Sequence, residues 1–109
     1  MSQSLAWTTL VAAGFLDVAW AVVMKYADGY TRPGWSVLSV LLLAAFVFLL
    51  GRALQALPVG TAYAVWTGIG AVGTVLMGVM LFGETLNSAR LGGIALVLTG
   101  IVALRLAPA

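Results

Sequence analysis

The sequence predicts an all-α membrane protein with four transmembrane helices, on the evidence of its composition and the spacing of its apolar residues. Of its 109 residues, 63% are hydrophobic and only 7% are charged, whereas a soluble domain usually carries about 25% charged residues. A chain of this size cannot bury so much apolar surface in a core of its own. The apolar residues form four unbroken runs rather than alternating with polar residues, which indicates helices instead of barrel strands.

The four runs define one domain of four helices, with short polar segments between them. A spanning helix needs about 20 apolar residues, and the first and third runs meet that length. The second and fourth are shorter, so we expect Arg52 and Arg105 to extend their side chains to the membrane surface and cover the mismatch. The predicted helices cover about residues 5–24, 35–50, 57–82 and 88–106.

The distribution of Lys and Arg gives almost no preferred orientation in the membrane. Four helices place both termini on one side together with Arg52 and Arg105, whereas Lys25, Arg32 and Arg90 lie on the other. Two against three is a weak signal under the positive-inside rule, so either the small bias fixes one orientation or the chain inserts both ways. Two copies in opposite orientations would form the inverted pair that many transporters build from internal repeats.

Several classes of function are excluded by what the sequence lacks. The chain has no Cys and no His, which excludes thiol chemistry and the usual zinc sites. It has no phosphate-binding loop, and its five basic residues are too scattered for a nucleic-acid partner. We therefore expect no enzyme activity, no metal and no cofactor.

Asp17 is the main candidate functional residue, because it alone among the charged residues lies well inside an apolar run. Placing an ionised carboxylate there costs at least about 2.5–3.5 kcal/mol, and no buried Lys or Arg offers it an ion pair. The structural alternative is a protonated carboxyl group bonded to a neighbouring helix. A carboxyl group in apolar surroundings does not easily hold a proton and a cation together. This competition is the minimum requirement for exchanging protons for a cationic substrate.

The residues near Asp17 fit a binding site. Gly14 and Trp20 lie three residues before and after it on the same helix face, and a small residue there leaves space for a ligand or a close helix. In the third run, Tyr63 and Trp66 also share a face. Aromatic faces attract cations, and the Tyr hydroxyl or Trp N–H would orient a carboxylate. The alternative is that these aromatic residues only pack or anchor the helices.

Glycines in the third and fourth runs indicate either flexibility or close helix contacts. Gly68, Gly70 and Gly73 fall within six residues and weaken a helix locally, so a bend there would move between two states. Close helix packing is the equal alternative, since glycine also serves that purpose. Gly93 and Gly100 are one heptad apart and share a helix face, which predicts a tight helix contact within or between chains.

Two segments resemble the small multidrug resistance transporters. Residues 14–26 (GFLDVAWAVVMKY) resemble the first helix of that family, and residues 57–70 (LPVGTAYAVWTGIG) closely resemble its third helix. Gly93 and Gly100 resemble the family's dimer contact in the fourth helix, so the resemblance covers nearly the whole chain. Within the family, both segments are most similar to the guanidinium exporters.

The resemblance implies an antiparallel, dual-topology homodimer that crosses the bacterial inner membrane several times and exports a small guanidinium-type cation in exchange for two protons. The proton gradient would drive the exchange with no cofactor, and proton and substrate would bind alternately to the acid at position 17 of both subunits. Gly14 and Trp20 would line this site, and Tyr63 and Trp66 would orient the acids. The family's third-helix hinge would correspond to Gly68, Ile69 and Gly70.

Two residues depart from the family's pattern. The acid of the family is almost always Glu, whereas this chain has Asp17, which is one methylene shorter and by itself more acidic. Both differences are expected to weaken coupling by leaving the carboxylate less easily protonated. In the second helix the guanidinium exporters usually carry a Ser that hydrogen-bonds the acid, and the alignment places Phe46 there. A Phe neither donates nor accepts that bond, and it fills volume.

These departures leave three interpretations open. The first is an active homodimer with altered pH dependence or substrate, favouring more hydrophobic guanidinium compounds. The second is one subunit of a heterodimer whose paralogous partner supplies the usual Glu and Ser. The third is a membrane scaffold or leak pathway without transport. The balanced basic residues favour the first over the second, since paired subunits tend to have opposite fixed orientations. The retention of an acid with Trp20, Tyr63 and Trp66 disfavours the third.

Overall fold

The computed structural model describes residues 2–107, and this part of the chain forms four helices and no strand. The helices are α1 (Gln3–Tyr26), α2 (Pro33–Ala53), α3 (Val59–Phe82) and α4 (Ser88–Leu106). Each helix is long and apolar enough to cross a membrane. The prediction of an all-α membrane protein with four spans is therefore confirmed.

α2 is longer than its apolar run suggested, and the expectation that it falls short of a full span is wrong. The helix has 21 residues. It begins at Pro33, because the first turn of a helix leaves its N–H groups unpaired and a residue without one fits there. At the other end it continues through Gly51 and Arg52 to Ala53. α4, with 19 residues, keeps its predicted bounds.

Short-range hydrogen bonds and one glycine set the other helix ends. The Ser2 hydroxyl accepts a hydrogen bond from the Leu5 N–H at 3.1 Å at the start of α1. The Asn87 side chain accepts one from the Arg90 N–H at 2.9 Å at the start of α4. Both are N-cap bonds, which satisfy N–H groups that have no partner inside the helix. α3 ends at Gly83, whose φ of 66° is a left-handed conformation that glycine adopts at little cost.

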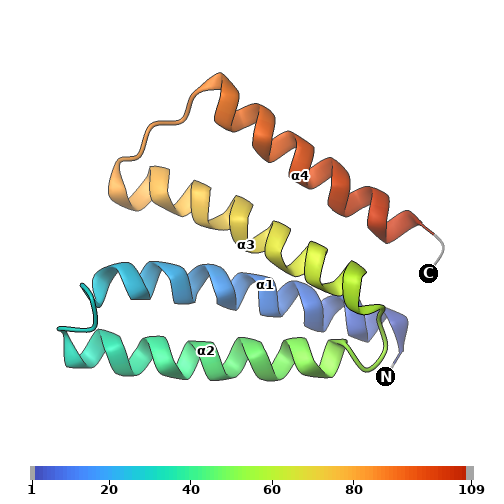
Figure 1. The fold of residues 1–109 in the computed structure, drawn as a ribbon, viewed down its shortest axis with the longest axis horizontal. Coiled ribbons are helices and arrows are strands. Elements are labelled where there is room, and N and C mark those ends of the chain that lie inside the picture. Colours follow the sequence, from blue (N-terminus) through green and yellow to red (C-terminus); the bar gives the residue numbers. More distant parts are fainter. Residues whose placement is uncertain (1, 108–109) are drawn as a thin grey trace.

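The four helices lie side by side in a single layer, in the spatial order α2, α1, α3, α4 (Figure 1). The molecule measures 44 × 34 × 17 Å, so it is little more than one helix thick. Within the described residues the backbone of α4 packs against α3 alone, and none of its residues is buried. Both chain ends lie at the same end of the layer (Figure 1). One copy of the described chain is therefore too thin to enclose a site between two layers.

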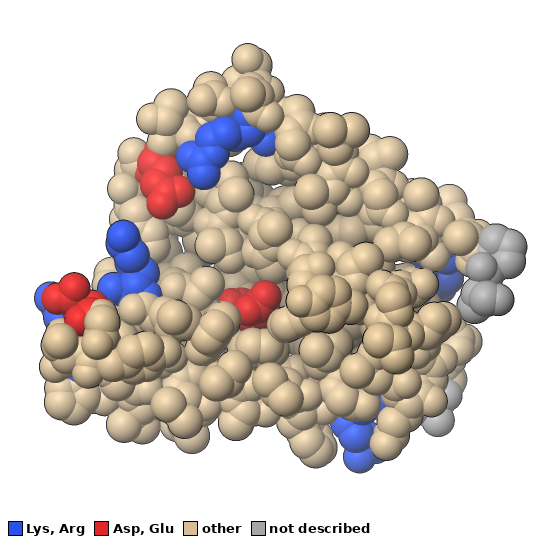
Figure 2. Space-filling view, viewed as in Figure 1, with Lys and Arg blue, Asp and Glu red and all other residues tan. Residues whose placement is uncertain are grey.

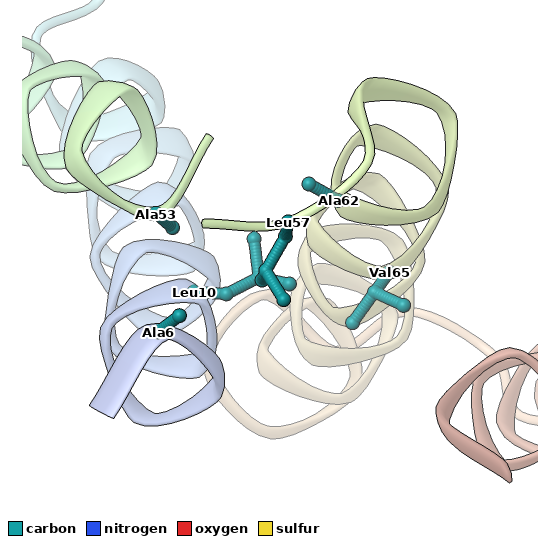
Figure 3. Close-up of a cluster of buried hydrophobic side chains, with 6 residues drawn as sticks. All are labelled: Ala6, Leu10, Ala53, Leu57, Ala62 and Val65. Atoms are coloured by element: carbon teal, nitrogen blue, oxygen red, sulfur yellow. The ribbon is translucent and has the colours of Figure 1, made fainter. Parts of the chain in front are cut away.

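A cluster of buried apolar side chains joins α1 to the end of α2, the loop after it and the start of α3 (Figure 3). Its members are small or branched, which lets helix backbones approach closely in lipid, where packing rather than exclusion of water drives association. They are Ala6, Leu10, Ala53, Leu57, Ala62 and Val65. The cluster fixes how α1 and α3 meet near the start of α1, about two to three helical turns before Asp17.

Glycines bring α1 and α3 together farther along. A Cβ added to Gly14 of α1 would lie 2.7 Å from the Cγ2 atom of Ile69, which is too close for any real side chain. A Cβ added to Gly73 of α3 would overlap Val18 in the same way. The two backbones approach as closely as they do because both positions lack a side chain.

The glycine-rich segment of α3 serves close packing in this structure. Gly68 faces α4, where an added Cβ would lie 3.0 Å from the Cδ1 atom of Ile101. α3 is one continuous helix from Val59 to Phe82. Of the two alternatives for this segment, helix packing is therefore observed directly, and a hinge at Gly68, Ile69 and Gly70 stays a prediction about another state.

Basic side chains near the helix ends lie over aromatic rings. The guanidinium carbon of Arg105 is 5.0 Å from the ring centre of Trp7, and that of Arg52 is 6.0 Å from Phe48. Such cation–π contacts hold a charge close to an apolar surface. They keep these two charges near the ends of α4 and α2, where a membrane-spanning helix must place them.

Candidate binding site

Asp17 lies in the contact between α1 and α3, with its carboxylate directly against Gly70. A Cβ added to Gly70 would overlap the Oδ2 atom of Asp17. Gly70 is itself buried, whereas Asp17 is partly exposed. The sequence placed Gly70 in a hinge, and the structure shows that it also forms the surface on which the carboxylate rests.

The Asp17 carboxylate has no hydrogen-bond donor or basic partner among residues 2–107. The ion pair in that part of the chain joins Arg90 and Glu84, whose Nη2 and Oε1 atoms are 3.4 Å apart at the far end of the layer. A charge without a partner in an apolar region is unfavourable. The site therefore favours whatever supplies a compensating positive charge, whether a proton or a cation.

Four aromatic rings form a continuous column beside this acid, and they come from three helices. Phe46 of α2 is 3% exposed and lies between two indole rings. Its ring centre is 5.4 Å from that of Trp20 in α1 and 5.6 Å from that of Trp66 in α3. Tyr63 extends the column, with its ring centre 5.5 Å from that of Trp66. Trp20, Tyr63 and Trp66, predicted separately, are thus brought together, and Phe46 connects them.

Both indole N–H groups of this column are buried without a hydrogen-bond partner in the described part of the chain. A buried donor without an acceptor costs about 1–3 kcal/mol, and native proteins usually provide an acceptor or a bound group. Trp20 and Trp66 are otherwise only partly buried. The two indoles therefore carry two N–H donors without an acceptor, and each ring is partly exposed.

Gly14 and Tyr63 do not lie as the sequence led us to expect. Gly14 is buried, and the space beside it is filled by Ile69 rather than left free for a ligand. Tyr63 is 60% exposed at the edge of the column. Its hydroxyl makes no hydrogen bond within residues 2–107, so it does not orient the carboxylate in this copy of the chain.

Gly93 and Gly100 lie on the exposed surface of α4. Within the described residues, nothing lies within 4 Å of a Cβ added at either position. The tight helix contact that their spacing predicts is therefore not made inside the chain.

A cleft of about 400 Å³ between α1, α3 and α4 begins one helical turn from Asp17. Ala21 and Thr74 line its inner part, and Lys25, Glu84 and Arg90 line its outer part. Figure 2 shows this hollow with acidic and basic side chains gathered along its edge. From Ala21 the cleft extends toward the end of the layer that holds the α3–α4 loop.

Lys25, Glu84 and Arg90, which line the outer part of the cleft, were not among the site residues predicted from the sequence. They appear in the sequence only as isolated charges near the ends of runs, and their gathering depends on how α4 turns back over α3. The Arg90 Nη1 atom donates to the Thr85 carbonyl at 2.5 Å in addition to its contact with Glu84, so it ties the α3–α4 loop. The Lys25 Nζ atom lies 5.8 Å from the ring centre of Phe82.

A family model described as Small Multidrug Resistance protein matches residues 5–97, which include all of α2 and α3 and most of α1 and α4. The chain belongs to the Small Multidrug Resistance protein family. The resemblance seen in the first and third helices is thereby confirmed over most of the chain.

Members of the Small Multidrug Resistance family with close sequence similarity carry the name guanidinium exporter. One from Yersinia pseudotuberculosis is 50% identical over 103 residues, covering 94% of this chain and 99% of the relative. One from Escherichia coli (strain K12) is 49% identical over 102 residues, covering 94% and 97%. One from Citrobacter freundii is 44% identical over 102 residues, with the same coverage. Four spans and this relationship identify a multi-pass transport protein of the bacterial inner membrane.

Proposed function

We propose that this chain is a proton-coupled antiporter that exports small guanidinium-type or related hydrophobic cations. The observation that carries the proposal is the Asp17 carboxylate, which lies inside a membrane-spanning helix, has no partner within residues 2–107 and adjoins a column of aromatic rings. The substrate class is suggested by the relatives, whose name is guanidinium exporter.

Proton and substrate compete for Asp17 in this proposal. A proton removes the charge of the carboxylate, and a guanidinium cation compensates it while donating two parallel hydrogen bonds to its oxygens. Since both occupants use the same oxygens, binding of one releases the other. The proton gradient then drives export, and the exchange needs neither a cofactor nor an enzymatic reaction.

In this proposal the aromatic column binds the flat face of the cation, whose N–H groups bind Asp17. A flat cation over an indole ring gains roughly 0.5–2 kcal/mol, more where water is excluded. Trp20 and Trp66 offer such faces, and their free N–H groups are donors for a carboxylate that moves away from Gly70. Tyr63 adjoins Trp66 and is placed to serve a site completed by a second copy.

A second copy in the opposite orientation completes the site in this proposal. The single layer of helices, the exposed apolar surface of α4 and its open Gly93 and Gly100 support association through that helix. The nearly balanced basic residues support insertion in both orientations. The dimer brings both Asp17 carboxylates to one central site. Bending of α3 at Gly68, Ile69 and Gly70 then exposes that site to one side of the membrane at a time.

Transport by the purified chain alone, reconstituted in liposomes on a solid-supported membrane, tests the proposal. Adding guanidinium or phenylguanidinium should produce a current, and Asp17→Asn should abolish it. Asp28→Asn is the matched control, because Asp28 lies in the exposed α1–α2 turn with a φ of 49° that Asn tolerates. Currents that persist in Asp17→Asn would refute the role of Asp17. Currents that appear only with a paralogous subunit would replace the homodimer by a heterodimer, and their absence with any partner would indicate a scaffold.

A further inference from the structure

α2 contributes one large buried side chain to the interior of the molecule, and that side chain is an aromatic ring. The buried residues of α2 are Ser39, Phe46 and Ala53. Ser39 lies two turns from Phe46 along the helix, and its hydroxyl is already hydrogen-bonded to the Tyr30 hydroxyl at 3.1 Å. At the level of Phe46, α2 therefore presents a hydrocarbon ring to its neighbours and no buried polar group.

Phe46 holds the two indole rings of the site in one wall. Its plane is inclined by 30° to Trp66 and by 54° to Trp20, with both ring centres within 6 Å. Aromatic pairs at this separation gain about 0.5–1.5 kcal/mol beyond the burial of their area. Because Phe46 is 3% exposed, it does not offer its own face to a ligand. It acts through Trp20 and Trp66, which remain partly exposed.

This wall discriminates between cations according to what surrounds their charge. Guanidinium itself is ringed by N–H donors, and the hydrocarbon faces of Phe46 and of the indole rings offer those donors no acceptor. A buried donor left without an acceptor is costly. A guanidinium that carries an apolar group directs its charged end to the carboxylate and its apolar end to the wall, so both ends have a suitable surface.

We propose that Phe46 is a positioning residue that fixes Trp20 and Trp66 as an apolar wall, and that this wall makes the site select aryl- or alkyl-substituted guanidinium cations over guanidinium itself. The inference rests on the proposed function and adds the substrate class within it. It assigns specificity to a contact between α1, α2 and α3 rather than to Asp17, which serves every cation alike.

Relative affinity for two cations tests this inference. Quenching of tryptophan fluorescence would measure binding of guanidinium and of phenylguanidinium to the full chain in detergent. The unsubstituted chain should bind phenylguanidinium about tenfold or more tightly. Phe46→Leu keeps an apolar side chain but removes the ring, and should reduce that ratio by roughly three- to tenfold, because phenylguanidinium loses more affinity than guanidinium. Phe46→Tyr keeps the ring and should restore the ratio.

Phe48→Leu is the matched control, since Phe48 lies on the same helix but is 63% exposed, and it should leave the ratio unchanged. A ratio unchanged in Phe46→Leu, or affinities for both cations lowered equally, would overturn the role of Phe46. Equal affinities in the unsubstituted chain would overturn the substrate class without requiring any variant to fold. Failure of every cation to bind the unsubstituted chain would refute the proposed function and this inference together, whereas tight binding of guanidinium without preference would refute this inference alone.

Discussion

The Asp17 side chain of α1 fits against Gly70 of α3 because Gly70 has no side chain. The carboxylate of Asp17 occupies the space that a side chain at position 70 would need, so glycine at 70 and an acid at 17 depend on each other. On either side of this contact, Gly14 and Gly73 also lack the side chains that would keep α1 and α3 apart. We therefore expect Gly70 to matter to any ligand that binds the Asp17 carboxylate.

The substitution Gly70→Ala tests this match. The added methyl group displaces the Asp17 carboxylate from its position, and overpacking of this kind costs about 1–3 kcal/mol. We expect cation affinity, measured by tryptophan fluorescence quenching, to fall about tenfold or more. Gly60→Ala on the same helix is the control, because nothing lies within 4 Å of a Cβ added there. Equal affinities in the two variants would show that the carboxylate does not need the space.

At the residue scale, sequence alone identified the acid but only part of its surroundings. Asp17 is conspicuous because a charge inside an apolar run is rare in any membrane protein. The role of Gly70 as a packing surface was not predictable, since it depends on the crossing of two helices. Phe46 entered only through the family resemblance, because one more Phe in an apolar run carries no signal of its own. Which of the predicted residues bind substrate stays a prediction.

At the element scale, α4 differs from the other three helices. Its backbone packs against α3 alone, and its outward-facing residues are exposed and mostly apolar. Gly93 and Gly100 share one face of that surface and have nothing packed against them in this chain. We expect this face to meet the α4 of a second copy.

Bulky substitution on this face is expected to disrupt that association. Gly93→Leu and Gly100→Leu should each reduce the fraction of chemically cross-linked dimer in detergent, because small residues allow close approach of helices in membranes. Gly92→Leu is the control, since it lies about 100° around the helix and is equally open. If Gly92→Leu dissociates the dimer as strongly as the other two, the Gly93 and Gly100 face is not the contact.

Hydropathy predicted the number of helices and their sequence along the chain, whereas it predicted the first and last residues of each helix less well. α4 matches its predicted range because Asn87 is a strong N-cap residue just before it. α2 was underestimated because Pro33 and Gly51 look like interruptions in an apolar run, although the first turn of a helix accepts Pro and a spanning helix accepts Gly. The gathering of Lys25, Glu84 and Arg90 at the outer cleft was not predictable, because it follows from how the loops fold.

At the scale of the whole molecule, the chain is a single layer of helices with its one intramembrane acid on an open face. Such a layer cannot shield a bound cation from lipid and from both aqueous sides by itself. A second copy is therefore needed to enclose the site, and the proposed function depends on proton and cation sharing Asp17 in that assembly. A substrate-driven current alone would not establish this, since a cation channel would also produce one.

The most direct test is cation affinity as a function of pH, measured for the unsubstituted chain, Asp17→Asn and Asp28→Asn. Competition requires that affinity falls as pH falls, by up to about tenfold per pH unit for each proton displaced, and levels off once the carboxylate is fully ionised. Asp28→Asn should follow the same curve, and Asp17→Asn should bind no cation at any pH. Affinity that does not change with pH in the unsubstituted chain, or binding that survives in Asp17→Asn, would show that proton and cation do not compete for Asp17.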